Sequence, residues 1–221
     1  MQKDKVELII FDLDGTIVNS IFDITDGVNY VLTKMNRENV SVMEVQSMVG
    51  SGVKKLIKLA LNDISDEVII ENALKLFQEY YSQNLITKTR PYDGVIKTLE
   101  QLSNFKKAIY SNKPQDLTDK VISGLGLDSY FDMVQGSDTT KYKTKPSPEG
   151  IHYILKKLNV KPENTIMVGD STHDILAGKR AGVRTCAVTY GYREEKVLIN
   201  ESPDYLIHEL PELLSILKDL P

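Results

Sequence analysis

Residues 6–16, VELIIFDLDGT, place a short apolar and β-branched run directly before an acidic turn. A run of this kind over 6–11, stopped by Asp-Leu-Asp-Gly, predicts a β-strand that is largely buried. It is much shorter than the roughly 20 apolar residues that cross a membrane as a helix. Because the run contains Glu7 and ends at Asp12, we expect a core strand here and not a signal peptide.

The chain beyond Arg90-Pro91 alternates strand patterns with helical ones. Strands are predicted over 107–110, 132–135, 165–168 and 184–188, and helices over 115–122, 174–181 and 210–220. A further helix is expected to begin at Ser147-Pro148, with serine as the N-cap and proline in the first turn. This alternation predicts an α/β fold, with a Rossmann-like parallel sheet that helices cover on both faces.

Residues 20–81 have a different pattern, in which apolar side chains recur at helical spacing. Ser41 and Glu44 have the spacing of a capping box, which marks the start of a helix. Gly50-Ser51-Gly52 interrupts the region near its middle. We therefore expect a helical insert between the first strand and the rest of the α/β fold.

Composition limits the class of protein. The 221 residues carry 27 Lys and Arg against 31 Asp and Glu, and the net charge of −4 argues against a protein built mainly to coat nucleic acid. The single cysteine, Cys186, can form no intramolecular disulfide and suits a reducing compartment. No apolar run is long enough to span a membrane. We expect a soluble, cytoplasmic protein with neither a nucleic-acid nor a membrane partner.

Polar side chains gather where the predicted strands end, which is where open parallel sheets bind their ligands. They are Asp12, Asp14, Ser111, Asn112, Asp170 and Asp174, with Lys145 in the loop before a helix. Asp12 and Asp14 point the same way in extended geometry, and Asp170 and Asp174 are neighbours in helical geometry. We expect all of these side chains to converge on one crevice.

The chemistry of these residue types indicates a metal and a phosphate. Four carboxylates in one crevice repel one another unless a cation lies among them. Oxygen ligands select a hard cation, and a few carboxylates with water and phosphate oxygens suit Mg²⁺ better than Ca²⁺. Ser111 can donate to a phosphoryl oxygen, and Lys145 supplies positive charge. Backbone N–H groups of Leu13, Asp14 and Asn112 can add an anion-binding turn.

Four motifs occur in a characteristic order. They are Asp12-Leu13-Asp14-Gly15-Thr16, Tyr110-Ser111-Asn112, Lys145-Pro146-Ser147-Pro148 and Gly169-Asp170-Ser171-Thr172-His173-Asp174. In this order they resemble the motifs of haloacid dehalogenase-like hydrolases, most of all the phosphoglycolate-phosphatase-like subgroup. The resemblance implies a core of residues 1–18 and 89–221, with a small helical cap over 19–88 inserted after the first strand. It also implies an Mg²⁺-dependent phosphatase that acts on a small phosphorylated metabolite.

The resemblance implies a role for each motif residue. Asp12 attacks phosphorus to form an aspartyl-phosphate, while Asp14 protonates the leaving oxygen and later activates water. Asp12, the backbone carbonyl of Asp14, and Asp170 hold Mg²⁺, and Asp174 orients these ligands. The serine and lysine of the second and third motifs bind the phosphoryl group. Dehalogenases of this kind lack the second carboxylate, so Asp14 favours hydrolysis of phosphate esters.

The break in the helical insert is a candidate substrate contact. Free N–H groups at Gly50, Ser51 and Gly52, ahead of a predicted helix, can bind an anionic group. We expect this loop to contact the non-phosphoryl end of the substrate, with Lys54 or Lys55 contributing charge. The alternative is a plain helix–helix turn with surface lysines.

Other interpretations stay open. An inorganic pyrophosphatase or a nucleotide phosphatase would use the same fold, and a binding or regulatory module without turnover is less favoured. The chain is expected to be a monomer or a homodimer. His173 lies among the acidic residues, but a histidine at a helix start is more often exposed or supporting than a general base. Asn19 stands where relatives often carry aspartate, which leaves phosphoglycolate itself an open assignment.

Overall fold

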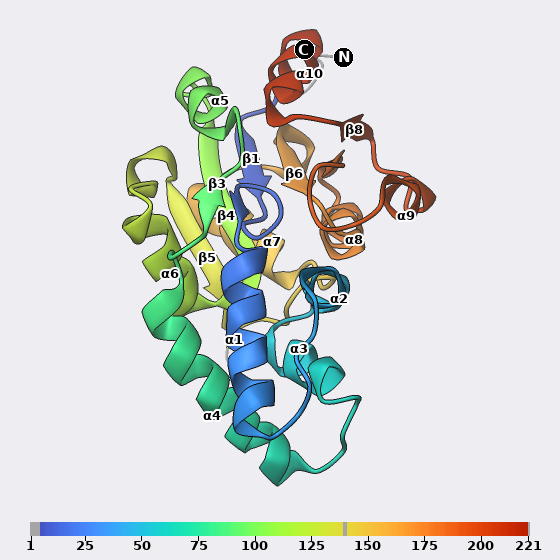
Figure 1. Cartoon of the computed structure of the whole chain (residues 1–221). Coiled ribbons are helices and arrows are strands. Elements are labelled where there is room, and N and C mark those ends of the chain that lie inside the picture. The colour runs from blue at the N-terminus through green and yellow to red at the C-terminus, as the bar shows by residue number, and fades with distance from the viewer. Residues whose placement is uncertain (1–4, 139–140, 221) are drawn as a thin grey trace.

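A six-stranded parallel sheet forms the centre of the computed structural model, which describes residues 5–138 and 141–220 (Figure 1). The strand order is β5-β4-β1-β6-β7-β8. The strands are β1 (Leu8–Phe11), β4 (Lys106–Pro114), β5 (Met133–Ser137), β6 (Thr165–Gly169), β7 (Arg184–Val188) and β8 (Tyr205–Ile207). All residues of β1 are buried between β4 and β6. The predicted α/β class and buried first strand are confirmed.

Side chains alternate between the two faces of the sheet, as strand geometry requires. Leu8 and Ile10 pack on the face covered by α7 (Glu149–Leu158) and α8 (Thr172–Ala181). Ile9 and Phe11 pack on the opposite face, which α5 (Val95–Gln101), α6 (Gln115–Gly124) and α10 (Leu213–Asp219) cover. A further helix, α9 (Glu195–Asn200), packs against β7. Short 3₁₀ turns lie at Asp128–Tyr130, Pro162–Asn164 and Leu210–Glu212.

The insert is a group of four helices, which we call the cap: α1 (Ile21–Lys34), α2 (Val42–Met48), α3 (Val53–Ala60) and α4 (Glu67–Asn84). The cap lies beyond the carboxyl ends of the strands, whereas α10 lies at the other end of the molecule (Figure 1). Two chain crossings join it to the sheet, at the antiparallel pair β2 (Val18–Asn19) and β3 (Arg90–Pro91). The predicted capping box at Ser41 and Glu44 is present.

The structure differs from the predicted elements at several boundaries. The helix expected to begin after Ser147 has Pro148 as its N-cap residue. The helix α8 begins at Thr172, because Asp174 closes a capping box with Ser171 and so lies inside the first turn. The strand β4 continues to Pro114 by pairing with β5 across a register shift. The edge strand β8 was not predicted; it has only three residues.

None of the described helices is both long and apolar enough to cross a membrane.

Candidate active site

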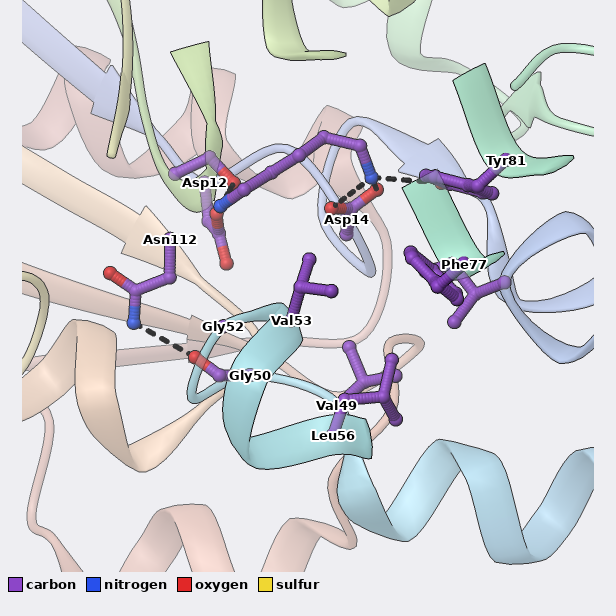
Figure 2. Close-up of a pocket in the computed structure, with 13 residues that line it drawn as sticks. Asp12, Asp14, Val49, Gly50, Gly52, Val53, Leu56, Phe77, Tyr81 and Asn112 are labelled. Carbon is purple, nitrogen blue, oxygen red and sulfur yellow. Dashed lines mark hydrogen bonds and ion pairs between the residues drawn. The ribbon is translucent and has the colours of Figure 1, made fainter. Parts of the chain in front are cut away.

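The predicted site residues come together under the cap because β1 lies between β4 and β6. A cavity lies there between cap and core, with about 510 Å³ of empty space that includes open solvent. The core lines it with Asp12, Asp14, Ser111, Asn112 and Lys113. The cap lines it with Ile24, Val49, Gly50, Gly52, Val53, Leu56, Phe77 and Tyr81 (Figure 2).

Three buried carboxylates form a cluster at one side of this cavity. Oxygens of Asp12, Asp170 and Asp174 lie within 4.8 Å of one another. Asp170 accepts the backbone N–H of Tyr192 at 2.7 Å, which fixes its orientation. Asp174 accepts the hydroxyl of Ser171 at 2.6 Å and thereby also caps α8. Neighbouring backbone and side-chain donors therefore hold the cluster in place.

Lys145 joins the carboxylates of this cluster. Its ammonium lies 2.8 Å from Oδ1 of Asp12 and 2.6 Å from Oδ1 of Asp174, and it donates to the carbonyl of Tyr110 at 2.9 Å. Burial opposes the charge on Lys145, but the carboxylates of Asp12 and Asp174 outweigh burial and raise its pKa. Lys145 is therefore a fixed positive charge beside Asp12.

One ammonium does not offset three carboxylates. Burial, followed by repulsion from Asp174, raises the pKa of Asp12 well above its ordinary value. The same two causes raise the pKa of Asp170 to about 7. Such a cluster of oxygen donors in a buried place suits a hard divalent cation, which would favour the ionised forms. The donor set therefore fits a metal ion.

Asp14 is held apart from the cluster and faces the cap. Its carboxylate accepts the Ser20 hydroxyl at 2.5 Å and the Lys113 ammonium at 2.9 Å. Figure 2 shows Asp14 between Asp12 and the cap residue Tyr81. The structure thus separates the two aspartates of the first motif, with Asp12 in the cluster and Asp14 toward the cap.

Gly15 lets the first loop approach the acidic cluster. Its φ is +90°, and a Cβ built at this position would lie 2.3 Å from Oδ2 of Asp170. Any side chain here would combine backbone strain with a clash against Asp170. The glycine therefore brings the loop after β1 against the loop after β6.

The residues after β1 and in β4 occupy different places around the cavity. Ser111 is buried and lines the cavity, and its Oγ accepts the backbone N–H of Lys113 at 3.2 Å. The Asn112 amide donates to the carbonyl of Lys145 at 3.0 Å and to the carbonyl of Gly50 at 2.8 Å. The N–H of Leu13 donates to Oδ1 of Asp12 at 2.7 Å. Asn112 thus orders the Lys145 loop and contacts the cap.

The structure separates the predicted cap residues. Gly50 and Gly52 line the cavity. Lys54 does not line it, because its ammonium lies 2.7 Å from Glu67 and its side chain is exposed. Ser51 contacts Nε2 of His173 at 3.2 Å, so the loop reaches the core here. Lys55 pairs with Asp63 at 3.2 Å and does not line the cavity either, so neither lysine supplies the charge expected at this loop.

His173 lies at the junction of cap and core. It is half-buried, and burial lowers its pKa. Among the described residues its buried Nδ1 has no hydrogen-bond partner. Arg193 extends the same junction by donating to the carbonyls of Gln46, at 2.7 Å, and of Val49.

Lys113 is not among the predicted site residues, although the sequence carries a signal for it. Lys113 follows Ser111 by two residues near the end of a strand, and this spacing places both side chains on the same face. Tyr81 and Arg193 carried no such signal, because their place depends on how cap and core meet. Tyr81 comes from α4, and Arg193 lies beyond β7.

Comparison with known proteins agrees with this geometry. The family model described as haloacid dehalogenase-like hydrolase matches residues 9–188. The phosphoglycolate phosphatase of Colwellia psychrerythraea is 36% identical, covering 99% of this chain and 100% of that protein. The phosphoglycolate phosphatase of Aquifex aeolicus is 35% identical, covering 96% of this chain and 97% of that protein.

Solved structures show the same architecture. The crystal structure of a predicted phosphoglycolate phosphatase from Haemophilus somnus superposes with a TM-score of 0.89 at 29% identity, covering 96% of this chain and 97% of that one. A predicted phosphatase from Clostridium acetobutylicum gives a TM-score of 0.87 at 26% identity, covering 97% and 100%. With the family model matching most of its length, this chain belongs to the haloacid dehalogenase-like hydrolase family.

Proposed function

We propose that the protein is an Mg²⁺-dependent phosphatase of small, phosphoglycolate-like phosphomonoesters. The observation that carries the proposal is the buried Asp12 carboxylate, 2.8 Å from Lys145 and within the three-aspartate cluster under the cap. The names of the relatives from Colwellia psychrerythraea and Aquifex aeolicus support the substrate class.

Asp12, Asp170 and the backbone carbonyl of Asp14 would hold Mg²⁺, and Asp174 would orient these ligands while it keeps Lys145 in place. When bound, the ion would neutralise charge on the phosphoryl oxygens and on the carboxylates around them. Asp174 suits this supporting role because one oxygen contacts Lys145 and the other accepts from Ser171.

The proposed reaction has two steps. In the first, an Asp12 oxygen bonds to phosphorus, the bond from phosphorus to the ester oxygen breaks, and Asp14 protonates that oxygen. In the second, Asp14 takes a proton from water, whose oxygen attacks phosphorus and releases phosphate from Asp12. Ser111 and Lys145 offset charge on the phosphoryl oxygens in both steps. Burial of Lys145 and Asp12 strengthens this effect.

Several wider features belong to the same proposal. We place the core at 1–18 and 89–221 and the cap at 19–88, since β2 and β3 pair where the chain crosses. The cap loop 50–52 would contact the part of the substrate that carries no phosphoryl group. A cytoplasmic location suits the buried, unpaired thiol of Cys186. The chain would act as a monomer or a homodimer.

Pyrophosphate is a second candidate substrate, because it is short and its second anionic end would find Lys113 in the cavity. A nucleotide fits less well, since Val49, Val53 and Leu56 close the cap side of the cavity with apolar groups.

The test is phosphate release from 2-phosphoglycolate, pyrophosphate, nucleotides and sugar phosphates, with Mg²⁺ and with EDTA. We expect Mg²⁺-dependent release, highest for 2-phosphoglycolate, and a loss of about 10⁴-fold or more in Asp12→Asn because the nucleophile is removed. Asp128→Asn is the matched control, since Asp128 is exposed in a 3₁₀ turn before β5. Full activity of Asp12→Asn, or no release from any compound by the folded wild type, would contradict the proposal.

A further inference from the structure

Lys113 is a buried cation in the cavity to which the proposed reaction gives no role. Its side chain is only 5% exposed. Its ammonium donates to Oδ2 of Asp14 at 2.9 Å and to the hydroxyl of Tyr81 at 2.9 Å. Burial opposes the charge, but the interactions with Asp14 and Tyr81 together raise the pKa of Lys113. Lys113 therefore carries its positive charge at neutral pH.

Lys113 and Tyr81 each keep one donor that can bind a ligand. An ammonium has three N–H groups. The two oxygens of the Asp14 carboxylate, at 3.1 and 2.9 Å, lie side by side and share one direction around it, and the Tyr81 hydroxyl occupies a second. Lysine can only donate, so the Tyr81 oxygen accepts from Lys113 and keeps its own O–H. Burial raises the pKa of Tyr81 to about 12, and no described residue accepts from its hydroxyl. One N–H of Lys113 and the O–H of Tyr81 can thus serve the same anion.

The residues around Lys113 and Tyr81 favour the binding of an anion at this pair. Among the described residues that line the cavity, Lys113 is the one cation. Ile24, Leu56 and Phe77 line the same cavity with apolar surface, in which an ion pair is stronger than in water. The Tyr81 ring stacks on Phe77 at 5.0 Å and lies 4.9 Å from the ammonium, which holds the hydroxyl in place.

The pair also spans the two parts of the molecule. Tyr81 belongs to α4 of the cap, whereas Lys113 ends β4 of the core. Figure 2 shows the contact to Tyr81 on the side of Asp14 that faces away from Asp12. Both donors therefore lie on the side where the leaving part of a substrate attached at Asp12 would extend, and both are in place when the cap covers the core.

We propose that Lys113 and Tyr81 form the subsite for a second anionic group of the substrate, a carboxylate on the part that is released. The preferred substrates are then short phosphomonoesters with an anion at each end. This inference rests on the proposed phosphatase function and assigns specificity within it. Lys113 contacts the substrate and Tyr81 positions Lys113 while donating to the same group.

The experiment compares two substrates of the same length. These are 2-phosphoglycolate, which ends in a carboxylate, and 2-hydroxyethyl phosphate, which ends in a neutral hydroxyl. We expect the wild type to prefer 2-phosphoglycolate in kcat/KM, and Lys113→Met to lose about 10- to 100-fold of that preference, the scale of a lost charged hydrogen bond. The ratio of kcat/KM between the two substrates decides the result, because loss of the ion pair with Asp14 changes turnover of both, and circular dichroism reports whether Lys113→Met is folded.

Two variants accompany Lys113→Met. Tyr81→Phe keeps the ammonium and its ion pair with Asp14, removes only the hydroxyl, and should lose about three- to tenfold of the same preference. It decides the result if Lys113→Met does not fold. Lys58→Met is the matched control, because that cap lysine pairs with Glu67 at 2.8 Å and does not line the cavity.

The outcomes separate this inference from the proposed function. No turnover of either substrate by the folded wild type overturns the proposed function. Turnover of both by wild type, with the same ratio in Lys113→Met and Tyr81→Phe, overturns the subsite and leaves the phosphatase. Pyrophosphate is a third test substrate. If the variants lose activity on pyrophosphate alone, the assignment to a carboxylate is overturned and the subsite binds a second phosphoryl group.

Discussion

Asp170 shows how a single residue couples protonation, metal binding and stability. Burial, and then repulsion from Asp174, raises its pKa to about 7 in the folded protein, above the ordinary value of 3.8. A carboxyl group with a raised folded pKa binds protons more tightly when folded. Its contribution to stability is therefore present at low pH and is lost as the pH rises through about 7. A divalent cation would reverse this by favouring the ionised form.

We expect the melting temperature in EDTA to fall between pH 5 and pH 8 more in the wild type than in Asp170→Asn. Saturating Mg²⁺ at pH 8 should raise the wild-type melting temperature by about 5–10 °C, because the ion binds only the folded state. Thermal unfolding followed by circular dichroism across this pH range measures both effects. Identical pH profiles for the two proteins would show that Asp170 does not carry the linkage.

Close packing between elements limits which side chain a position tolerates, and the packing of α7 on β4 is an example. A Cβ at Gly150 in α7 would lie 2.3 Å from the Tyr110 ring of β4. Alanine is the better helix former by up to about 1 kcal/mol, but the clash costs more. We expect Gly150→Ala to lower the free energy of unfolding by about 1–3 kcal/mol in urea titrations. Lys156→Ala, exposed on the same helix, should change it little, and equal values would refute this account.

The contact of α2 with the loop after β7 leads to a prediction about KM. Arg193 donates to the Gln46 and Val49 carbonyls, and the Gln46 amide donates to the Tyr192 carbonyl at 3.1 Å. Loss of the two Arg193 bonds weakens the contact between α2 and this loop by about 1–2 kcal/mol. Arg193→Ala should therefore raise KM by up to about tenfold with little change in melting temperature. Lys196→Ala removes an exposed ion pair with Glu194 and should leave KM unchanged.

The whole molecule consists of a sheet core and a cap that are joined at two crossings (Figure 1). Residues of both parts line the cavity. The buried Asp23 carboxylate ties the second crossing, because it accepts the N–H groups of Lys88 at 2.9 Å and of Thr89 at 2.8 Å. Closure of a cap over a cavity commonly accompanies catalysis. Ligand binding should therefore slow backbone opening at the crossings as well as in the cavity.

With Mg²⁺ and inorganic phosphate, we expect slower amide hydrogen exchange around Asn19 and Lys88 and in the cap loop 50–52. Exchange in β6, at the centre of the sheet, should change little because it reports global opening. Asp12→Asn tests whether the change follows the site. Protection confined to the core strands would show that ligand binding does not act on the cap.

Local chemistry explains what could be predicted from sequence. The apolar run before Asp12 predicts a buried strand. The motifs place Asp12 and Asp170 at strand ends, which parallel strands bring to one edge, and Lys145 in a loop before a helix. The family and the fold class followed from these residues and are confirmed. The extent of β4 could not be predicted, because pairing with β5 decides it.

Tertiary structure alone decided which charges reach the cavity. Lys54 follows the cap glycines in sequence, yet its ammonium pairs with Glu67. Lys113 carried no motif, yet it lies buried between Asp14 and Tyr81, which are 67 residues apart along the chain. A lysine side chain is long and flexible, so its position depends on the partners that surround it. Those partners come from both cap and core, and only their packing brings them together.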